Sequence, residues 1–163
     1  MIKARLNQLP RSFKWAITAF VLLASLGFGV AALMSLNHYG LSHEKTVTYY
    51  LGNEAEYAFP KLYSQILQTA HVHSFTMPLV FLGIWIALQF TGLRSRTKSL
   101  MVLGGTISIV IYNAAPFLLR YFTPRAAWLF TVGGVGLFVF FLVPAGIVLY
   151  DLWFGCESCQ ESI

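Results

Sequence analysis

Four long runs of apolar residues, separated by short polar and charged segments, dominate the pattern of the chain. The hydrocarbon core of a bilayer is about 30 Å thick and is crossed by roughly 20 helical residues, and each run has about that length. The runs cover residues 15–36, 74–90, 100–119 and 126–150. The pattern therefore predicts an all-α integral membrane protein, built as a four-helix transmembrane bundle.

The composition agrees with this prediction. Hydrophobic residues make up 57% of the chain and charged residues only 10%, whereas soluble domains have about 25% charged residues. The apolar excess therefore faces lipid. We expect residues 1–155 to form a single membrane domain and residues 156–163 to form a short cytoplasmic tail.

The net charge of +5 does not indicate a nucleic-acid partner. The basic residues cluster beside the apolar runs, where they serve as topology signals and meet anionic headgroups. The lipid bilayer is therefore the expected partner, and no nucleic acid is expected.

The first apolar run follows four basic residues and could be mistaken for a signal peptide. It is longer than the apolar region of such peptides, which has about 7–15 residues. We therefore interpret it as a retained membrane span.

The distribution of Lys and Arg predicts the orientation. Four basic residues precede the first span and three lie in the 94–98 segment, whereas the connection between the third and fourth spans has only Arg120 and Arg125. Because basic flanks stay in the cytoplasm, both termini are predicted to be cytoplasmic, in the inner (plasma) membrane. Residues 37–73 then lie on the periplasmic side.

This extracytoplasmic connection is unusually long. Loops beyond about 12–15 residues are usually functional or disordered. Pro60 suits a first helical turn, and the apolar residues Leu62, Ile66 and Leu67 would lie on one side of such a helix. We expect the loop to be partly helical and the second long helix to begin near Lys61, outside the membrane.

All four histidines of the chain, His38, His43, His71 and His73, map to the periplasmic side. On a helix, His71 and His73 point roughly 200° apart, whereas His73 and Met77 share a face. His73 is therefore the better candidate to face the bundle interior. If the helix began only at His73, His71 and His73 could instead converge on one metal ion from an extended segment.

Other polar residues, among them Asn113, Thr131 and His38, are expected at about the same depth in the membrane as His73. Buried polar groups in lipid are costly and need partners. The sequence therefore predicts a polar pocket in the periplasmic half of the bundle, bounded by His73, Met77, Asn113, Thr131 and His38.

One interpretation of this pocket is a b-type haem held by His73. The second axial ligand would be His38, His43 or Met77, since His/His and His/Met pairs both occur in electron-transfer haems. Arg120 or Arg125 would lie near the propionates. The pattern is superficially similar to four-helix cytochromes of the cytochrome b561 kind, but the third and fourth spans have no histidine, so two haems cannot be held across the membrane.

A second interpretation is a site for copper or another transition metal, with His71, His73, His43 and Met77 as candidate ligands. Imidazole and thioether groups suit Cu(I). Glu44 beside His43 could add a carboxylate, but the segment lacks the H-E-x-x-H spacing of a zinc protease.

A third interpretation assigns these residues structural roles only. The chain would then be a non-catalytic accessory or assembly subunit of a membrane complex. The sequence has no Ser/His/Asp set, no phosphate loop and no intramembrane acid, which favours a protein that is not an enzyme on its own. We predict a membrane-embedded redox or metal-binding subunit, with a larger membrane complex or an electron-transfer partner; Cys156 and Cys159 are expected to be reduced tail thiols.

Overall fold

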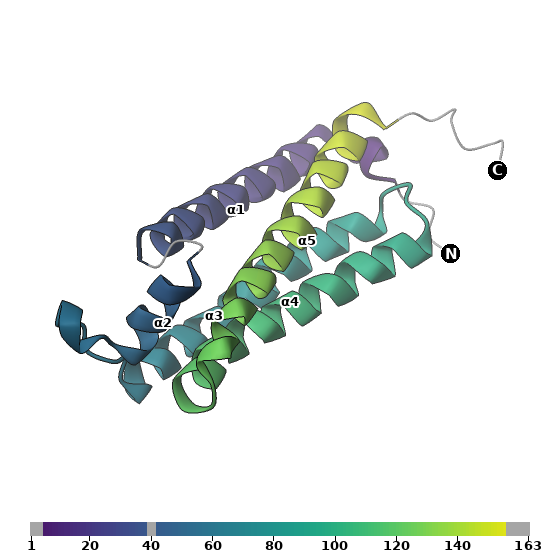
Figure 1. The fold of residues 1–163 in the computed structure, drawn as a ribbon. Coiled ribbons are helices and arrows are strands. Elements are labelled where there is room, and N and C mark those ends of the chain that lie inside the picture. Colours follow the sequence, from purple (N-terminus) through teal and green to yellow (C-terminus); the bar gives the residue numbers. More distant parts are fainter. Residues whose placement is uncertain (1–4, 39–41, 156–163) are drawn as a thin grey trace.

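The computed structural model describes residues 5–38 and 42–155. In this part of the chain four long helices lie along one another (Figure 1). They are α1 (Arg11–His38), α3 (Tyr63–Gln89), α4 (Ser95–Tyr121) and α5 (Ala127–Phe154). Each belongs to a helical segment that is long and apolar enough to cross a membrane. The predicted four-helix transmembrane bundle is therefore confirmed.

The helices extend past the apolar runs at most of their ends. The clearest case is α3, which begins at Tyr63, two residues after Lys61. The side chain of Gln65 accepts a hydrogen bond from the backbone N–H of Leu62 at 3.0 Å, which satisfies one of the donors that a helix start leaves unpaired. The prediction that this helix begins near Lys61 is confirmed.

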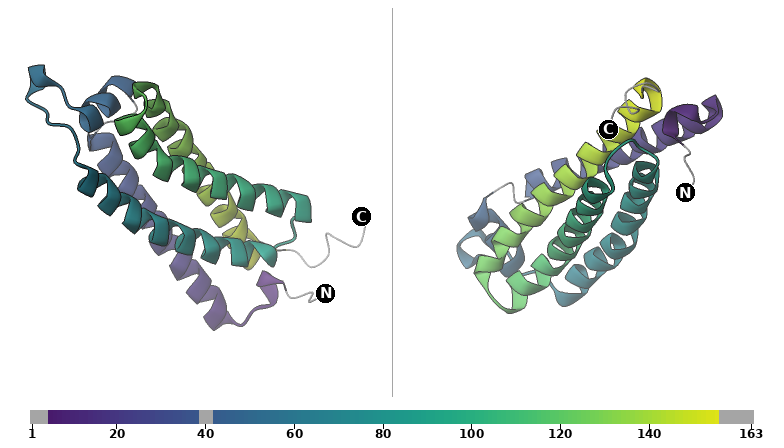
Figure 2. Two further views of the ribbon diagram at one scale, coloured as in Figure 1. Left: turned by 90° about the horizontal axis from the view of Figure 1, so that it is seen from below. Right: turned by 90° about the vertical axis from the view of Figure 1, so that its right-hand side faces the viewer.

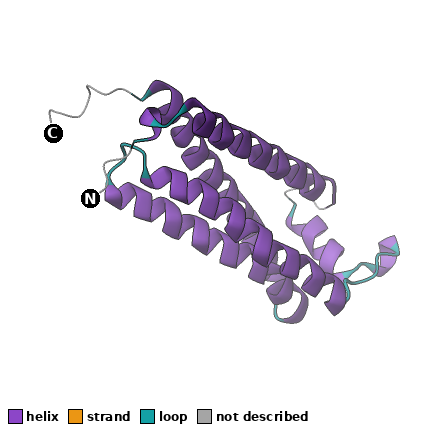
Figure 3. Ribbon diagram, turned by 180° about the vertical axis from the view of Figure 1, so that it is seen from behind, coloured by secondary structure: helices purple, strands orange, loops and turns teal. Residues whose placement is uncertain are grey.

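Short helical elements precede α1 and occur in two of the three connections between the long helices. They are η1 (Leu6–Gln8), α2 (His43–Leu51), η2 (Glu54–Glu56) and η3 (Pro124–Ala126). No strand occurs among the residues described (Figure 3). The long connection between α1 and α3 is thus partly helical, as predicted.

The turn after α2 requires glycine. Gly52 has a φ of 82°, and a Cβ at this position would lie 2.6 Å from the carbonyl oxygen of Ala58. Glycine alone adopts this conformation without a steric cost. The turn directs η2 away from the helices, so that it projects beyond the end of the bundle (Figure 2).

The start of α1 and the end of α5 lie at the same end of the bundle, and α2, η2 and η3 lie at the other (Figure 1). Asn7 donates a hydrogen bond to the carbonyl of Gly155 at 3.0 Å, and Leu6 is buried in one cluster with Leu152. The amino-terminal segment is therefore fixed to the end of α5.

The packed centre of the bundle lies among α3, α4 and α5. Phe81 and Phe141 are fully buried there, with ring centroids 5.8 Å apart. α1 adds Val21 to this core and stacks Phe28 on Phe141, at 4.3 Å between ring centroids.

Most of α1 nevertheless remains uncovered by the rest of the protein. Between Trp15 and Leu36 its exposed large side chains are all apolar, as suits contact with lipid. They include Leu22, Leu23, Leu26, Val30, Leu33 and Met34.

Candidate functional site

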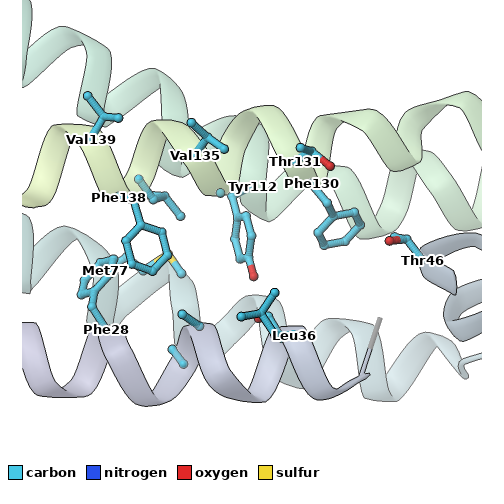
Figure 4. A pocket seen from close by; sticks show the side chains of 15 residues that line it. Phe28, Leu36, Thr46, Met77, Tyr112, Phe130, Thr131, Val135, Phe138 and Val139 are labelled. Atoms are coloured by element: carbon cyan, nitrogen blue, oxygen red, sulfur yellow. The ribbon is translucent and has the colours of Figure 1, made fainter. Parts of the chain in front are cut away.

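A cavity of about 380 Å³ lies where α1 and α5 separate (Figure 4). α5 contributes seven of its lining residues, between Phe130 and Val139, and α1 contributes five, between Phe28 and Leu36. Thr46 from α2, Met77 from α3 and Tyr112 from α4 complete the wall. All five helices therefore shape the cavity.

The cavity opens toward the lipid-facing surface. Three of its lining side chains are about half exposed: Leu36 at 50%, Val135 at 56% and Val139 at 48%. Since all three are apolar and lie on membrane-spanning helices, they border an opening that acyl chains can reach.

The polar groups of the wall are hydroxyls. They belong to Ser35, Thr46, Tyr112 and Thr131, and no charged side chain is among the lining residues that the structure describes. The hydroxyl of Tyr112 points across the cavity toward Leu36 on α1 (Figure 4). That of Thr46 donates to the carbonyl of Ser42 at 2.9 Å.

His73 and Met77 lie one turn apart on α3, as the sequence predicts. Met77 lines the cavity. His73 does not line the cavity; its ring contacts that of Tyr112, which does, at 6.1 Å between centroids. Because α3 is helical through His71 as well, the extended arrangement in which both imidazoles approach one ion is not present.

The other histidines do not join His73. The ring of His38 contacts Tyr49, that of His43 contacts Trp128 and that of His71 contacts Phe75, at 5.5, 5.4 and 5.1 Å. Within residues 5–38 and 42–155, no three His, Cys, Asp or Glu side chains come close enough to hold a metal ion. The geometry thus gives no support to the metal site, which stays a prediction.

The two arginines considered for haem propionates lie outside the cavity wall. Arg120 donates from Nε to the carbonyl of Lys61 at 3.2 Å. Arg125 is exposed, and its backbone N–H donates to the hydroxyl of Thr123 at 3.3 Å, at the start of η3. Cys156 and Cys159 lie outside the described residues.

Asn113 faces a different hollow from its neighbour Tyr112. It lines a second, shallower cavity of about 410 Å³ together with Ser74 and Pro78. Its amide nitrogen donates to the carbonyl of Ile109 at 2.9 Å, while its buried oxygen has no hydrogen-bond partner among the residues described.

The predicted polar pocket is therefore correct in part. Of its five proposed residues, Met77 and Thr131 line the cavity between α1 and α5, and His38, His73 and Asn113 do not. Sequence reasoning missed the α1 wall. The small residues Ala31, Ala32 and Ser35 were its only signal, since small side chains leave space between membrane helices.

Residues 40–159 match the Aq_1264_TM family, whose description is a transmembrane helical domain. The match covers well over half of the chain. The chain belongs to this family. The Aq_1264_TM match includes α2 to α5 and begins after α1, so the α1 wall of the cavity comes from outside the matched part. No curated protein and no solved structure matches the chain. Membership in Aq_1264_TM and the four apolar helices together identify a multi-pass membrane protein.

Proposed function

We propose that this protein binds an apolar, lipid-like molecule inside the membrane, in the cavity between α1 and α5. The cavity itself carries the proposal. Its volume of about 380 Å³ falls within the roughly 300–1,000 Å³ of small-molecule sites. Because its rim is apolar and faces the bilayer, a lipid-like molecule reaches it sideways without crossing a polar surface.

The physical chemistry of the wall favours an apolar occupant. Side chains around an empty space lose dispersion contacts on that side. Water would find few hydrogen-bond partners, since most of the lining is Ala, Gly, Val, Leu and Phe. A hydrocarbon chain restores the contacts at no such cost.

Filling the cavity tests the proposal. Gly134 lies in the α5 wall, and a Cβ there would meet only Tyr112, at 3.8 Å, which is ordinary contact. The side chain in Gly134→Leu therefore occupies the cavity without striking backbone. We expect about tenfold less co-purified lipid-like ligand per protein, measured by extraction and mass spectrometry.

Gly146→Leu is the matched control. Gly146 lies on the same helix, and a Cβ there would meet nothing within 4 Å. This variant is expected to retain the wild-type amount of ligand. Full retention by Gly134→Leu, or an equal loss in both variants, would show that the cavity is not the binding site.

The second candidate function is the redox or metal-binding subunit, with a b-type haem or copper. One observation bears on its haem form. Met77 and Tyr112 both line the cavity, and His73 lies against Tyr112 one turn from Met77. Absorption spectra and metal analysis of protein purified after haem and copper supplementation provide the test: a Soret band that His73→Ala abolishes supports haem, and colourless, metal-free protein excludes both.

The non-catalytic alternative is an accessory or assembly subunit of a larger membrane complex. This alternative differs from both candidates because it needs no bound molecule. It is favoured if the wild-type protein holds no more lipid than Gly134→Leu and binds neither haem nor metal.

We further propose that the protein lies in the inner (plasma) membrane with both termini in the cytoplasm. The basic 94–98 segment lies at the end of the bundle where α1 begins and α5 ends, so the basic residues before α1 and those of this segment share one side, as the positive-inside rule requires. In a variant without Cys156 and Cys159, an impermeant thiol reagent added from outside should label Ala55→Cys and miss Ser95→Cys. The reverse labelling would invert the orientation.

A further inference from the structure

We infer that the occupant of the cavity is an uncharged, single-chain lipid whose polar end is a hydroxyl or carbonyl group held near Tyr112 and Thr131. This inference rests on the proposed function and specifies the chemical class of its ligand.

The cavity is polar at one end and apolar at the other. α1 and α5 run in opposite directions along it, so Ser35 and Thr131 lie at the end near α2, while Phe28 and Phe138 lie deeper. The rings of Phe28 and Phe138 contact each other at 6.2 Å between centroids. About two helical turns, or roughly 10 Å, separate the two levels on each helix, a length that suits an amphiphile lying along the helices.

No charged side chain occurs among the described lining residues, which limits the chemical groups that the polar end of the ligand can carry. An ionised phosphate or carboxylate would enter an apolar site without a compensating cation, which costs several times more than burying a neutral polar group. Neutral groups meet no such penalty.

The hydroxyls present the chemistry that a neutral polar end requires. Tyrosine and threonine O–H groups donate to a carbonyl oxygen and accept from a ligand hydroxyl. The Tyr112 side chain crosses the cavity from α4 with its oxygen toward α1 (Figure 4). Thr131 lines the same end from α5.

The volume favours one chain. About 380 Å³ is near the lower end of the range for small-molecule sites. Twelve of the fifteen lining residues belong to α1 and α5, so the space is narrow and a second acyl chain would have to remain outside.

The experiment compares binding of lipids that differ only in their polar end. The full-length protein, in nanodiscs, is titrated with photoactivatable probes of one chain length that end in a hydroxyl, a ketone, an ionised carboxylate or a plain alkyl group. We expect the hydroxyl and ketone probes to bind at least about tenfold more tightly than the carboxylate probe.

Two variants locate the polar end. Tyr112→Phe and Thr131→Val each remove a hydroxyl at nearly constant shape. Each variant should bind the hydroxyl and ketone probes about fivefold more weakly, as expected for the loss of one hydrogen bond. Its affinity for the plain alkyl probe should be unchanged. A purely structural role of these side chains would weaken all probes alike.

Equal binding of the carboxylate probe, unchanged affinities in both variants, or equal weakening of every probe would overturn this inference. The proposed function would survive any of these results if Gly134→Leu still reduced binding of the probes about tenfold. Absence of binding by every probe to the wild-type protein would refute both.

Discussion

The two faces of α5 differ in how closely a neighbouring helix approaches. Toward α4, a Cβ on Gly133 would lie 3.0 Å from the backbone nitrogen of Tyr112, and one on Gly136 would collide with the hydroxyl of Ser108. Toward α1, the contact depends on large aromatic side chains such as Phe28. A Cβ on either glycine of α1, Gly27 or Gly29, would meet nothing within 4 Å.

The difference explains why the cavity lies where it does. In a membrane no hydrophobic force drives helices together, so close association depends on small residues that let the backbones approach. α5 uses its glycines against α4, which makes a tight pair. α1 is held at a greater distance by rings, and the space that remains is the cavity.

The largest expected effect is on the tight face. Gly133→Leu places a side chain against the backbone of Tyr112, which cannot move without shifting α4. We expect the free energy of unfolding, measured by denaturation in mixed detergent micelles, to fall by about 3 kcal/mol. An unchanged stability would show that α4 and α5 are not closely packed.

A smaller effect is expected on the loose face. Phe28→Ala removes the ring that stacks on Phe141 and contacts Phe81 and Phe138. Since Phe28 is only partly buried, we expect a loss of about 2 kcal/mol rather than the larger values of fully buried rings. Spin labels on α1 and α5 should also show the helices closer together, because the ring that separates them is gone. Phe13→Ala, at a position on α1 that is 60% exposed, is the control and should change neither quantity.

The contact between the start of α1 and the end of α5 should contribute less. The indole N–H of Trp153 donates to the hydroxyl of Thr18 at 3.0 Å. Hydrogen bonds between membrane helices average about 0.6 kcal/mol. A double-mutant cycle of Trp153→Phe and Thr18→Val should give a coupling free energy of about this size. A coupling of zero would show that this hydrogen bond does not stabilise the contact between α1 and α5.

The smallest effect should come from the unused glycines of α1. Gly29→Leu adds a side chain where no neighbour lies, so the free energy of unfolding should stay within about 0.5 kcal/mol of the wild type. A loss as large as that of Gly133→Leu would mean that another helix covers this face.

The sequence predicts the fold well because the membrane limits the possibilities. Long apolar runs can only be spanning helices here, since lipid cannot satisfy an open backbone. Pro60 also places the start of α3 to within a few residues. The distance of α1 from the bundle could not be predicted, because its apolar side chains suit lipid and protein equally well.

The sequence predicts the depth of the candidate site residues in the bundle, but not the direction in which their side chains point. The helical rise places Met77, Asn113 and Thr131 at a common level, and Met77 and Thr131 do line the cavity. Tyr112 and Asn113 are neighbours in sequence, yet their side chains point about 100° apart. Tyr112 faces the cavity between α1 and α5, and Asn113 faces the second cavity. Which side chain faces which cavity depends on how α4 is rotated about its axis against α5.

The histidines show a similar limit. Their shared position on one side of the bundle follows from the sequence alone. The surroundings of His38 and His43 do not, because tertiary packing brings Tyr49 and Trp128 near them. His71 contacts Phe75, which lies one turn away on the same helix. The side of the membrane therefore gave no information on whether the rings converge.

The most direct test of the central claim is to map where a neutral photoactivatable lipid crosslinks to the wild-type protein. Peptide mass spectrometry should place the adducts on residues 28–36 of α1 and 130–139 of α5, and Gly134→Leu should reduce them about tenfold. Adducts spread over the lipid-facing surface of α1, including Leu22 and Leu23, and equally abundant in Gly134→Leu, would contradict a specific binding site between α1 and α5.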